Sequence, residues 1–125
     1  MVSGISMSDE FIVVATKEIN DDIAGIKNIL DSCTNDQSIF QNSPSLQKYT
    51  HKIKGLAPMM GKEELGNLAS LLDKILKQTI EGKSFEGILH ILTESLHNMK
   101  LSMAESDCDL NPIIGEIQQF SSNSS

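Results

Sequence analysis

The sequence has no tryptophan, one tyrosine and four phenylalanines, so aromatic residues make up only 4% of its 125 residues. With so few rings, the core must be built from Ile, Leu and Met, which suits packed helices better than a β-sandwich. A chain of this length has room for one domain with a single core. No apolar run approaches membrane-spanning length, and the N-terminus lacks the basic and apolar regions of a signal peptide.

Arginine is also absent, and ten lysines stand against seventeen acidic residues, which gives a formal net charge of -7. This balance argues against nucleic acid as the main partner, because phosphate contacts need clustered cations. The two cysteines, Cys33 and Cys108, are far apart and form no CxxC pair, which indicates free thiols in a reducing compartment. The sequence therefore predicts a soluble cytoplasmic protein with neither a membrane nor nucleic acid as its partner.

Nucleotide-binding motifs are missing as well. The chain has no Gly-rich nucleotide loop and no Walker motif, and it is too short to include a kinase ATP-binding domain. These absences argue against ATP binding by the chain itself.

Four long stretches have apolar residues at the period of an amphipathic helix. Their short connections predict an all-α fold, an antiparallel four-helix bundle, with a short fifth helix across an end or a side. In the first helix, we expect Glu18, Asp21 and Asp22 to face water. The expected helices are residues 8–31 with Ser8 as N-cap, Pro44 or Ser45 to about Met60, 63–80, 85–104 capped by Ser84, and 112–120 capped by Asn111.

The segments outside these helices are small and polar. We expect residues 1–7 to be a flexible N-terminus, residues 32–43 a loop and residues 121–125 a disordered tail, with the bundle spanning 8–120. Pro58 should kink or loosen the second helix, and Gly61 suits the turn that follows it. The Met start and the Ser-rich end suit a freestanding protein.

The second helix presents a histidine to solvent. At about 100° per residue, His51 falls opposite the apolar stripe, and Lys54, Gly55 and Pro58 share its face. A glycine one turn on leaves the imidazole, a possible nucleophile, unscreened by a neighbouring side chain. The stripe itself consists of Leu46, Tyr49, Ile53, Leu56 and Met60.

The charge around this histidine differs from that of the whole chain. Residues 37–62 contain no Asp or Glu but four lysines, which predicts a local positive patch where an anion could bind. These lysines are Lys48, Lys52, Lys54 and Lys62.

Together these residues resemble the motif of the histidine-containing phosphotransfer (HPt) family, His-x-x-Lys-Gly followed by a second glycine six residues on. The motif stands here as His51, Lys54, Gly55 and Gly61. The run 59–61, with the leucines at 65, 68 and 72, is most similar to the phosphotransfer domain of chemotaxis-type histidine kinases. The resemblance covers residues 8 to 105.

The resemblance implies that His51 is phosphorylated and that Lys54 neutralises charge on the transferred group. In chemotaxis-type kinases a glutamate on the next helix holds the inner nitrogen of the histidine, and its position here is Asp73. Asp is one methylene shorter, so this contact could be longer or water-mediated. A family histidine three residues earlier is replaced by Ser70. The alternative for Asp73 is a simple i+4 pair with Lys77.

The expected docking surface surrounds the histidine and includes Lys48, Lys52, Gly55, Pro58 and Met59. Proline at 58 departs from the small residue that is usual in the family. No cofactor is expected in the chain itself, because the receiver domain would supply the magnesium. Elsewhere, His90, Glu94 and His97 share one helix face, which we interpret as solvated and not as a metal site.

These features predict a histidine phosphotransfer protein of a two-component phosphorelay. It would be a phosphoryl carrier with no ATP-dependent kinase activity of its own, served by a sensor histidine kinase and response-regulator receiver domains. One alternative is a degenerate HPt-like bundle that docks receivers without being phosphorylated. Another is a helical bundle with unrelated partners, in which the acid-free segment is a coincidence.

Overall fold

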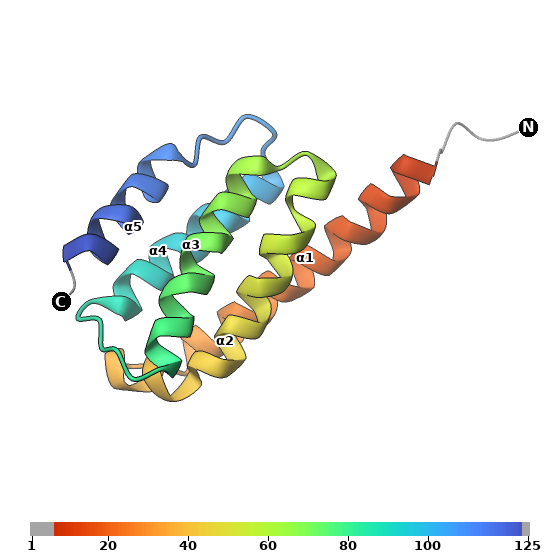
Figure 1. The fold of residues 1–125 in the computed structure, drawn as a ribbon. Helices are drawn as coiled ribbons and strands as arrows, with labels where there is room; N and C mark the ends of the chain where they lie inside the picture. The colour runs from red at the N-terminus through yellow and green to blue at the C-terminus, as the bar shows by residue number, and fades with distance from the viewer. Residues whose placement is uncertain (1–6, 124–125) are drawn as a thin grey trace, which may run out of the picture.

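The structure, a computed structural model, describes residues 7–123 and the side chains of residues 9–123. The described chain is helical, and the predicted antiparallel four-helix bundle with a short fifth helix is confirmed (Figure 1). Its elements are α1 (Met7–Asp31), α2 (Asp36–Leu56), the 3₁₀ helix η1 (Pro58–Met60), α3 (Glu63–Ile80), α4 (Ile88–Ala104) and α5 (Asn111–Asn123).

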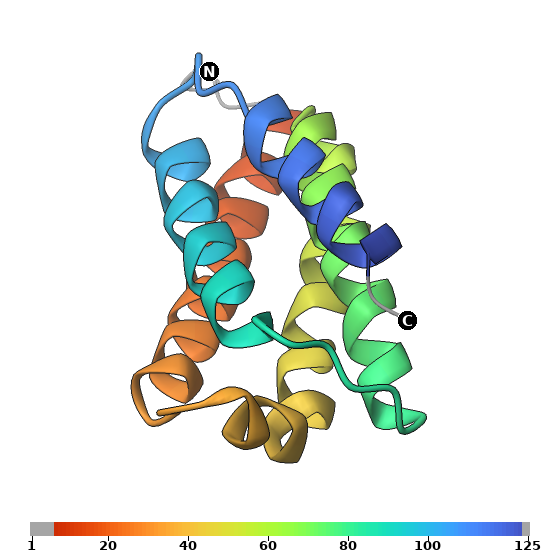
Figure 2. The ribbon, with the colours of Figure 1, turned by 90° about the vertical axis from the view of Figure 1, so that its left-hand side faces the viewer.

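The first four helices run alternately up and down, with α1 against α2 and α4, and α2 against α3 (Figure 2). Helix α5 packs mainly on α3 and also contacts α4, so it covers the seam between them. The ring of Phe120 in α5 stacks on Phe85 in the α3–α4 connection, with the centroids 5.7 Å apart. The N-terminal turns of α1 extend past the other helices (Figure 1).

The core is aliphatic, as the composition predicts. Helix α3 has the predicted bounds, and all six residues of its predicted apolar side are buried. Each fully buried Leu or Ile contributes roughly 1.5–3 kcal/mol to stability. These six residues are Leu65, Leu68, Ala69, Leu72, Ile75 and Leu76.

Helix α2 begins much earlier than predicted, so most of the expected loop 32–43 is helical. The side chain of Asn35 caps it by accepting a hydrogen bond of 2.9 Å from the Ser38 amide. Pro44 lies inside the helix instead of opening it, although a proline there removes one helical hydrogen bond. The complete burial of Ile39 in the added turns offsets that cost.

Helix α4 begins at Ile88 and not at Phe85, and Ser84 does not cap it. The carboxylate of Asp36, at the start of α2, caps it instead by accepting hydrogen bonds from the amides of Gly87 (2.8 Å) and Leu89 (2.9 Å). Gly87 has a φ of +89°, which glycine adopts without strain. The periodicity of α4 itself could not reveal a cap supplied from another helix.

Both ends of the chain are more helical than predicted. Helix α1 begins at Met7, so Ser8 lies inside it and is not its N-cap, and α5 starts at Asn111 and continues to Asn123. Residues 121–123 are therefore helical and not disordered. The flexible N-terminus was predicted for residues 1–7, but Met7 is helical; residues 1–6, and residues 124–125 of the predicted disordered tail, lie outside the described residues. Within 7–123, none of the helices combines the length and apolarity needed to cross a membrane.

Candidate functional site

The end of α2 is shaped by Pro58 and Gly61, as predicted. The helix stops at Leu56, η1 follows, and Gly61 makes the turn with a φ of +82°. The proline ring lies against α3, because a Cβ atom added to Gly66 would be only 2.6 Å from Pro58 Cγ. This contact fixes where the α2–η1 segment meets the first turns of α3.

His51 lies on the open face of α2. Its side chain is 59% exposed, and a Cβ atom added to Gly55 would meet nothing within 4 Å. Lys48 and Pro58 are exposed, and Met59 is 68% exposed. A partner can therefore approach the imidazole past a glycine without displacing a side chain.

Behind the imidazole stands a buried carboxylate. Asp73 on α3 is only 2% exposed, and its Oδ1 lies 3.6 Å from Nδ1 of His51, which is longer than a hydrogen bond. The alternative pairing occurs as well, since Lys77 Nζ lies 3.5 Å from Oδ2. Lys54 Nζ is 3.4 Å from the same oxygen. The structure thus joins His51, Lys54 and Asp73 in one cluster.

The charge state of Asp73 follows from its contacts. Burial raises the pKa of Asp73, but the hydrogen bond from Gln47 and the charges of Lys77 and Lys54 outweigh it. The net effect holds the pKa below its ordinary value of 3.8. The carboxylate is therefore ionised at neutral pH and can act as a hydrogen-bond acceptor for an imidazole N–H.

Gln47 is the member of this cluster that the sequence reasoning missed. Its Nε2 donates a hydrogen bond of 2.6 Å to Oδ1 of Asp73, the oxygen that faces His51. The available signal was its spacing, because Gln47 lies four residues before His51 on the same helix face. Its partner lies on another helix, which spacing along α2 does not show.

Lys52 points away from this cluster, toward α1. Its Nζ lies 2.9 Å from Oδ1 of Asp22 and 4.0 Å from Glu18. The prediction that Asp22 faces water is wrong, because it is only 2% exposed and its Oδ2 has no hydrogen-bond partner within residues 7–123. Helix α1 packs against both α2 and α4, so its buried face is wider than its apolar stripe.

The pKa of Asp22 is raised, and burial is the largest cause, opposed by the hydrogen bond and charge of Lys52.

The positive patch predicted for residues 37–62 is partly neutralised by carboxylates from other helices. Asp22 on α1 and Asp73 on α3 are paired with two of its four lysines, Lys52 and Lys54. The positive patch is weaker in space than along the sequence. Ser70, which precedes Asp73 on α3, is half-buried.

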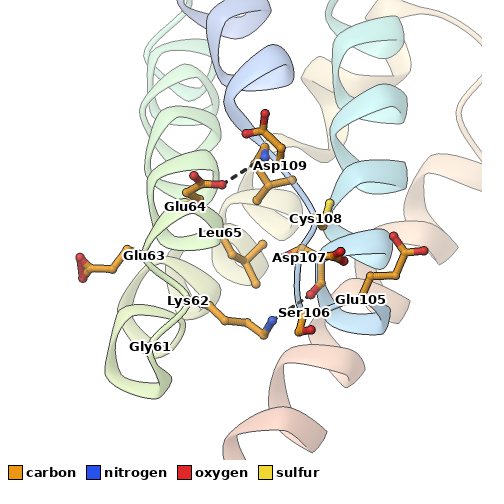
Figure 3. A pocket seen from close by; sticks show the side chains of 12 residues that line it. Gly61, Lys62, Glu63, Glu64, Leu65, Glu105, Ser106, Asp107, Cys108 and Asp109 are labelled. Carbon is orange, nitrogen blue, oxygen red and sulfur yellow. Dashed lines mark hydrogen bonds between the residues drawn. The ribbon is translucent and has the colours of Figure 1, made fainter.

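A groove of about 440 Å³, which His51 does not line, lies between the start of α3 and the α4–α5 loop (Figure 3). Lys62 Nζ donates to the Ser102 carbonyl in the last turn of α4, and Glu64 accepts from the Leu110 amide at the end of the loop, so the two side chains tie both ends of the loop to the start of α3. Burial, the largest cause, and then nearby carboxylates raise the pKa of the Cys108 thiol above its ordinary value of 9.0. Its thiol is therefore protonated and a poor nucleophile at neutral pH.

The other histidines lie on α4. Nε2 of His90 is 3.8 Å from Glu94 Oε1, and both His90 and His97 are exposed. Across the part of the chain that the structure describes, no three His, Cys, Asp or Glu side chains are placed to hold one metal ion.

Comparisons with known proteins do not add to this description. No protein-family model, curated protein or solved structure matches the chain. The chemistry of the cluster formed by Gln47, His51, Lys54, Asp73 and Lys77, which we call the His51 cluster, is therefore the basis for assigning a function.

Proposed function

We propose that this protein is a phosphoryl carrier of a two-component phosphorelay, with His51 as the residue that is phosphorylated. The observation that carries the proposal is the placement of His51 between an open face and a buried ionised carboxylate. The imidazole is 59% exposed, and Oδ1 of Asp73 faces its Nδ1 at 3.6 Å. Asp73 would favour a proton on Nδ1, which leaves Nε2 as the nitrogen with a free lone pair.

In the proposed step, Nε2 of His51 attacks the phosphorus of an aspartyl phosphate on a receiver domain. The new N–P bond forms as the P–O bond to the aspartate breaks, and the carboxylate leaves with the electron pair. Nδ1 keeps its proton, and Asp73 stabilises the positive charge that develops on the ring. The reverse reaction passes the group to a second receiver aspartate, and a kinase catalytic domain could load the histidine instead.

Lys54 supports this proposal in a second way. Its Nζ is 3.4 Å from Asp73, and its side chain is 40% exposed, so the ammonium lies near the imidazole without being enclosed. Phosphoryl transfer depends mainly on positioning and on neutralising charge. In our proposal Lys54 supplies part of that charge, and magnesium on the receiver supplies the rest.

The proposed partners are response-regulator receiver domains and a sensor histidine kinase in the cytoplasm. They would dock on the open face of α2, which carries Lys48 and Gly55, and on the exposed Pro58 and Met59 of η1. Lys52 is directed toward α1, so we assign it to holding α1 against α2 and not to direct contact with the receiver.

The test is phosphoryl transfer from a panel of phosphorylated receiver domains to the wild type and to His51→Gln. We expect acid-labile, base-stable label on the wild type and none on the variant, with unchanged helix content by circular dichroism. His97→Gln, at an exposed position on α4, is the matched control and should be labelled normally. Absence of label from every receiver and kinase domain, on a folded protein, would overturn the proposal in favour of docking without phosphorylation.

A further inference from the structure

Gln47 makes the shortest contact in the His51 cluster. Its amide is 2.6 Å from Oδ1 of Asp73, whereas the two lysines lie 3.4 and 3.5 Å from Oδ2. A hydrogen bond to an ionised carboxylate is among the stronger polar contacts in a protein. The position of Oδ1 is therefore set more by Gln47 than by any other side chain that contacts Asp73 in residues 9–123.

We propose that Gln47 is a positioning residue that holds Oδ1 of Asp73 toward His51 and so fixes which imidazole nitrogen carries the proton. This inference rests on the proposed function and adds to it a residue that does not touch the phosphoryl group. Gln47 and His51 are one turn apart on α2, and the same carboxylate oxygen faces both of them. An oxygen of an ionised carboxylate has two lone pairs and can accept from both donors.

The alternative is that Gln47 competes with His51 and keeps it away from Asp73. The surrounding charges favour positioning over competition. Lys54 on α2 and Lys77 on α3 are both paired with Oδ2, whereas Oδ1 faces Gln47 and His51. Without the Gln47 amide, the carboxylate would turn toward the two ammonium groups, and Oδ1 would move away from the imidazole.

The charges on the other side of His51 do not offset the attraction of the Asp73 carboxylate toward Lys54 and Lys77. Lys52 is the adjacent cation, and it is paired with Asp22 and Glu18 of α1. These groups therefore largely balance one another, and Asp73 is the carboxylate that lies within 4 Å of the imidazole in residues 9–123. The tautomer of His51 should consequently follow the position of Asp73.

The experiment measures the tautomer directly by nitrogen NMR on protein with labelled histidine, at a pH where the imidazole is neutral. The His51 signals are assigned by their loss in His51→Gln. Gln47→Leu has nearly the same size but no donor, and Gln47→Asn keeps the amide but is too short to reach. Gln41→Leu, at an exposed position of α2, is the matched control.

We expect the Nδ1–H form to predominate in the wild type and in Gln41→Leu. Its ratio to the Nε2–H form should fall roughly threefold or more in both Gln47 variants, the effect of losing one hydrogen-bonded position. Asp73→Asn should give a similar fall, and Gln47→Leu combined with Asp73→Asn should show little further change. Two variants at position 47 keep the test decisive if Gln47→Leu does not fold.

Transfer kinetics provide the second measurement. At saturating receiver, the rate should fall about tenfold in Gln47→Asn, with little change in KM, because Gln47 acts on the imidazole and not on docking. An unchanged tautomer ratio, or a higher proportion of Nδ1–H in the variants, would overturn the positioning role even if the wild type accepts a phosphoryl group. A shifted tautomer in a protein that no receiver labels would instead overturn the proposed function and leave the role of Gln47 intact.

Discussion

Replacement by alanine should change the free energy of unfolding in opposite directions at two glycines in the helices around His51. Replacing glycine by alanine inside a helix ordinarily stabilises a protein by about 0.5–1 kcal/mol. A Cβ atom on Gly55 meets nothing within 4 Å, so Gly55→Ala should show that gain. A Cβ atom on Gly25 in α1 would collide with Cζ of Tyr49, which reaches across from α2, and would lie 2.6 Å from its Cε1.

In Gly25→Ala the tyrosine ring must move, and overpacking of this kind costs about 1–3 kcal/mol. After the helix gain is subtracted, we expect a loss of roughly 1 kcal/mol, so the two variants should differ by about 2 kcal/mol. Urea unfolding followed by circular dichroism measures both free energies. Equal stabilisation of the two variants would refute the reasoning, because it would mean that α1 and α2 are not held closely through Tyr49.

The same variants separate stability from transfer. Gly55→Ala adds a methyl group to the face where we propose that the receiver docks. Its transfer rate at limiting receiver should fall although its stability rises, whereas Gly25→Ala should keep its transfer rate while it remains folded. A Gly55→Ala protein that transfers normally would exclude a close approach of the receiver over this glycine.

The remaining predictions concern other polar contacts. Asp36→Ala removes the acceptor for two α4 amides and should lower the unfolding free energy by about 1–2 kcal/mol in urea titrations, and an unchanged midpoint would contradict the cap. For Asp73 the folded-state pKa is depressed, so its contribution is present above pH 3.8 and is lost as pH falls through the folded value, and Asp73→Asn should unfold with a shallower acid dependence. For Asp22 the folded-state pKa is raised, so stability falls as pH rises above 3.8 through the folded value, and Asp22→Asn should abolish that fall in the same pH series.

How well the sequence predicted each element depended on whether the information was local. Helix α3 has a regular apolar period between Gly61 and Gly82, and its bounds and buried face follow from that pattern alone. The start of α2 was missed because proline is common in the first turn of a helix and the segment before Pro44 is polar, so the sequence favoured a helix start at Pro44. Residues before Pro44 are helical because Ile39 is buried by other helices, which the local composition does not report.

The candidate site shows the same division. The exposure of His51 and the open space at Gly55 follow from positions on one helix. Gln47 and Asp22 were missed or misplaced because their partners, Asp73 and Lys52, lie on neighbouring helices. Apolar periodicity locates the centre of a buried face but not its edges, where charged side chains can be buried once a partner reaches them.

The contact between Pro58 and Gly66 has a consequence for how this sequence can evolve. A side chain at position 66 would collide with the proline ring, since its Cβ atom would lie 2.6 Å from Cγ and 2.9 Å from Cδ. Which side chains are tolerated at position 66 therefore depends on the residue at position 58. In descendants of this sequence, a residue larger than glycine at 66 should become tolerable only after Pro58 has been exchanged for a smaller residue, so the order of the two substitutions is constrained as well as their pairing.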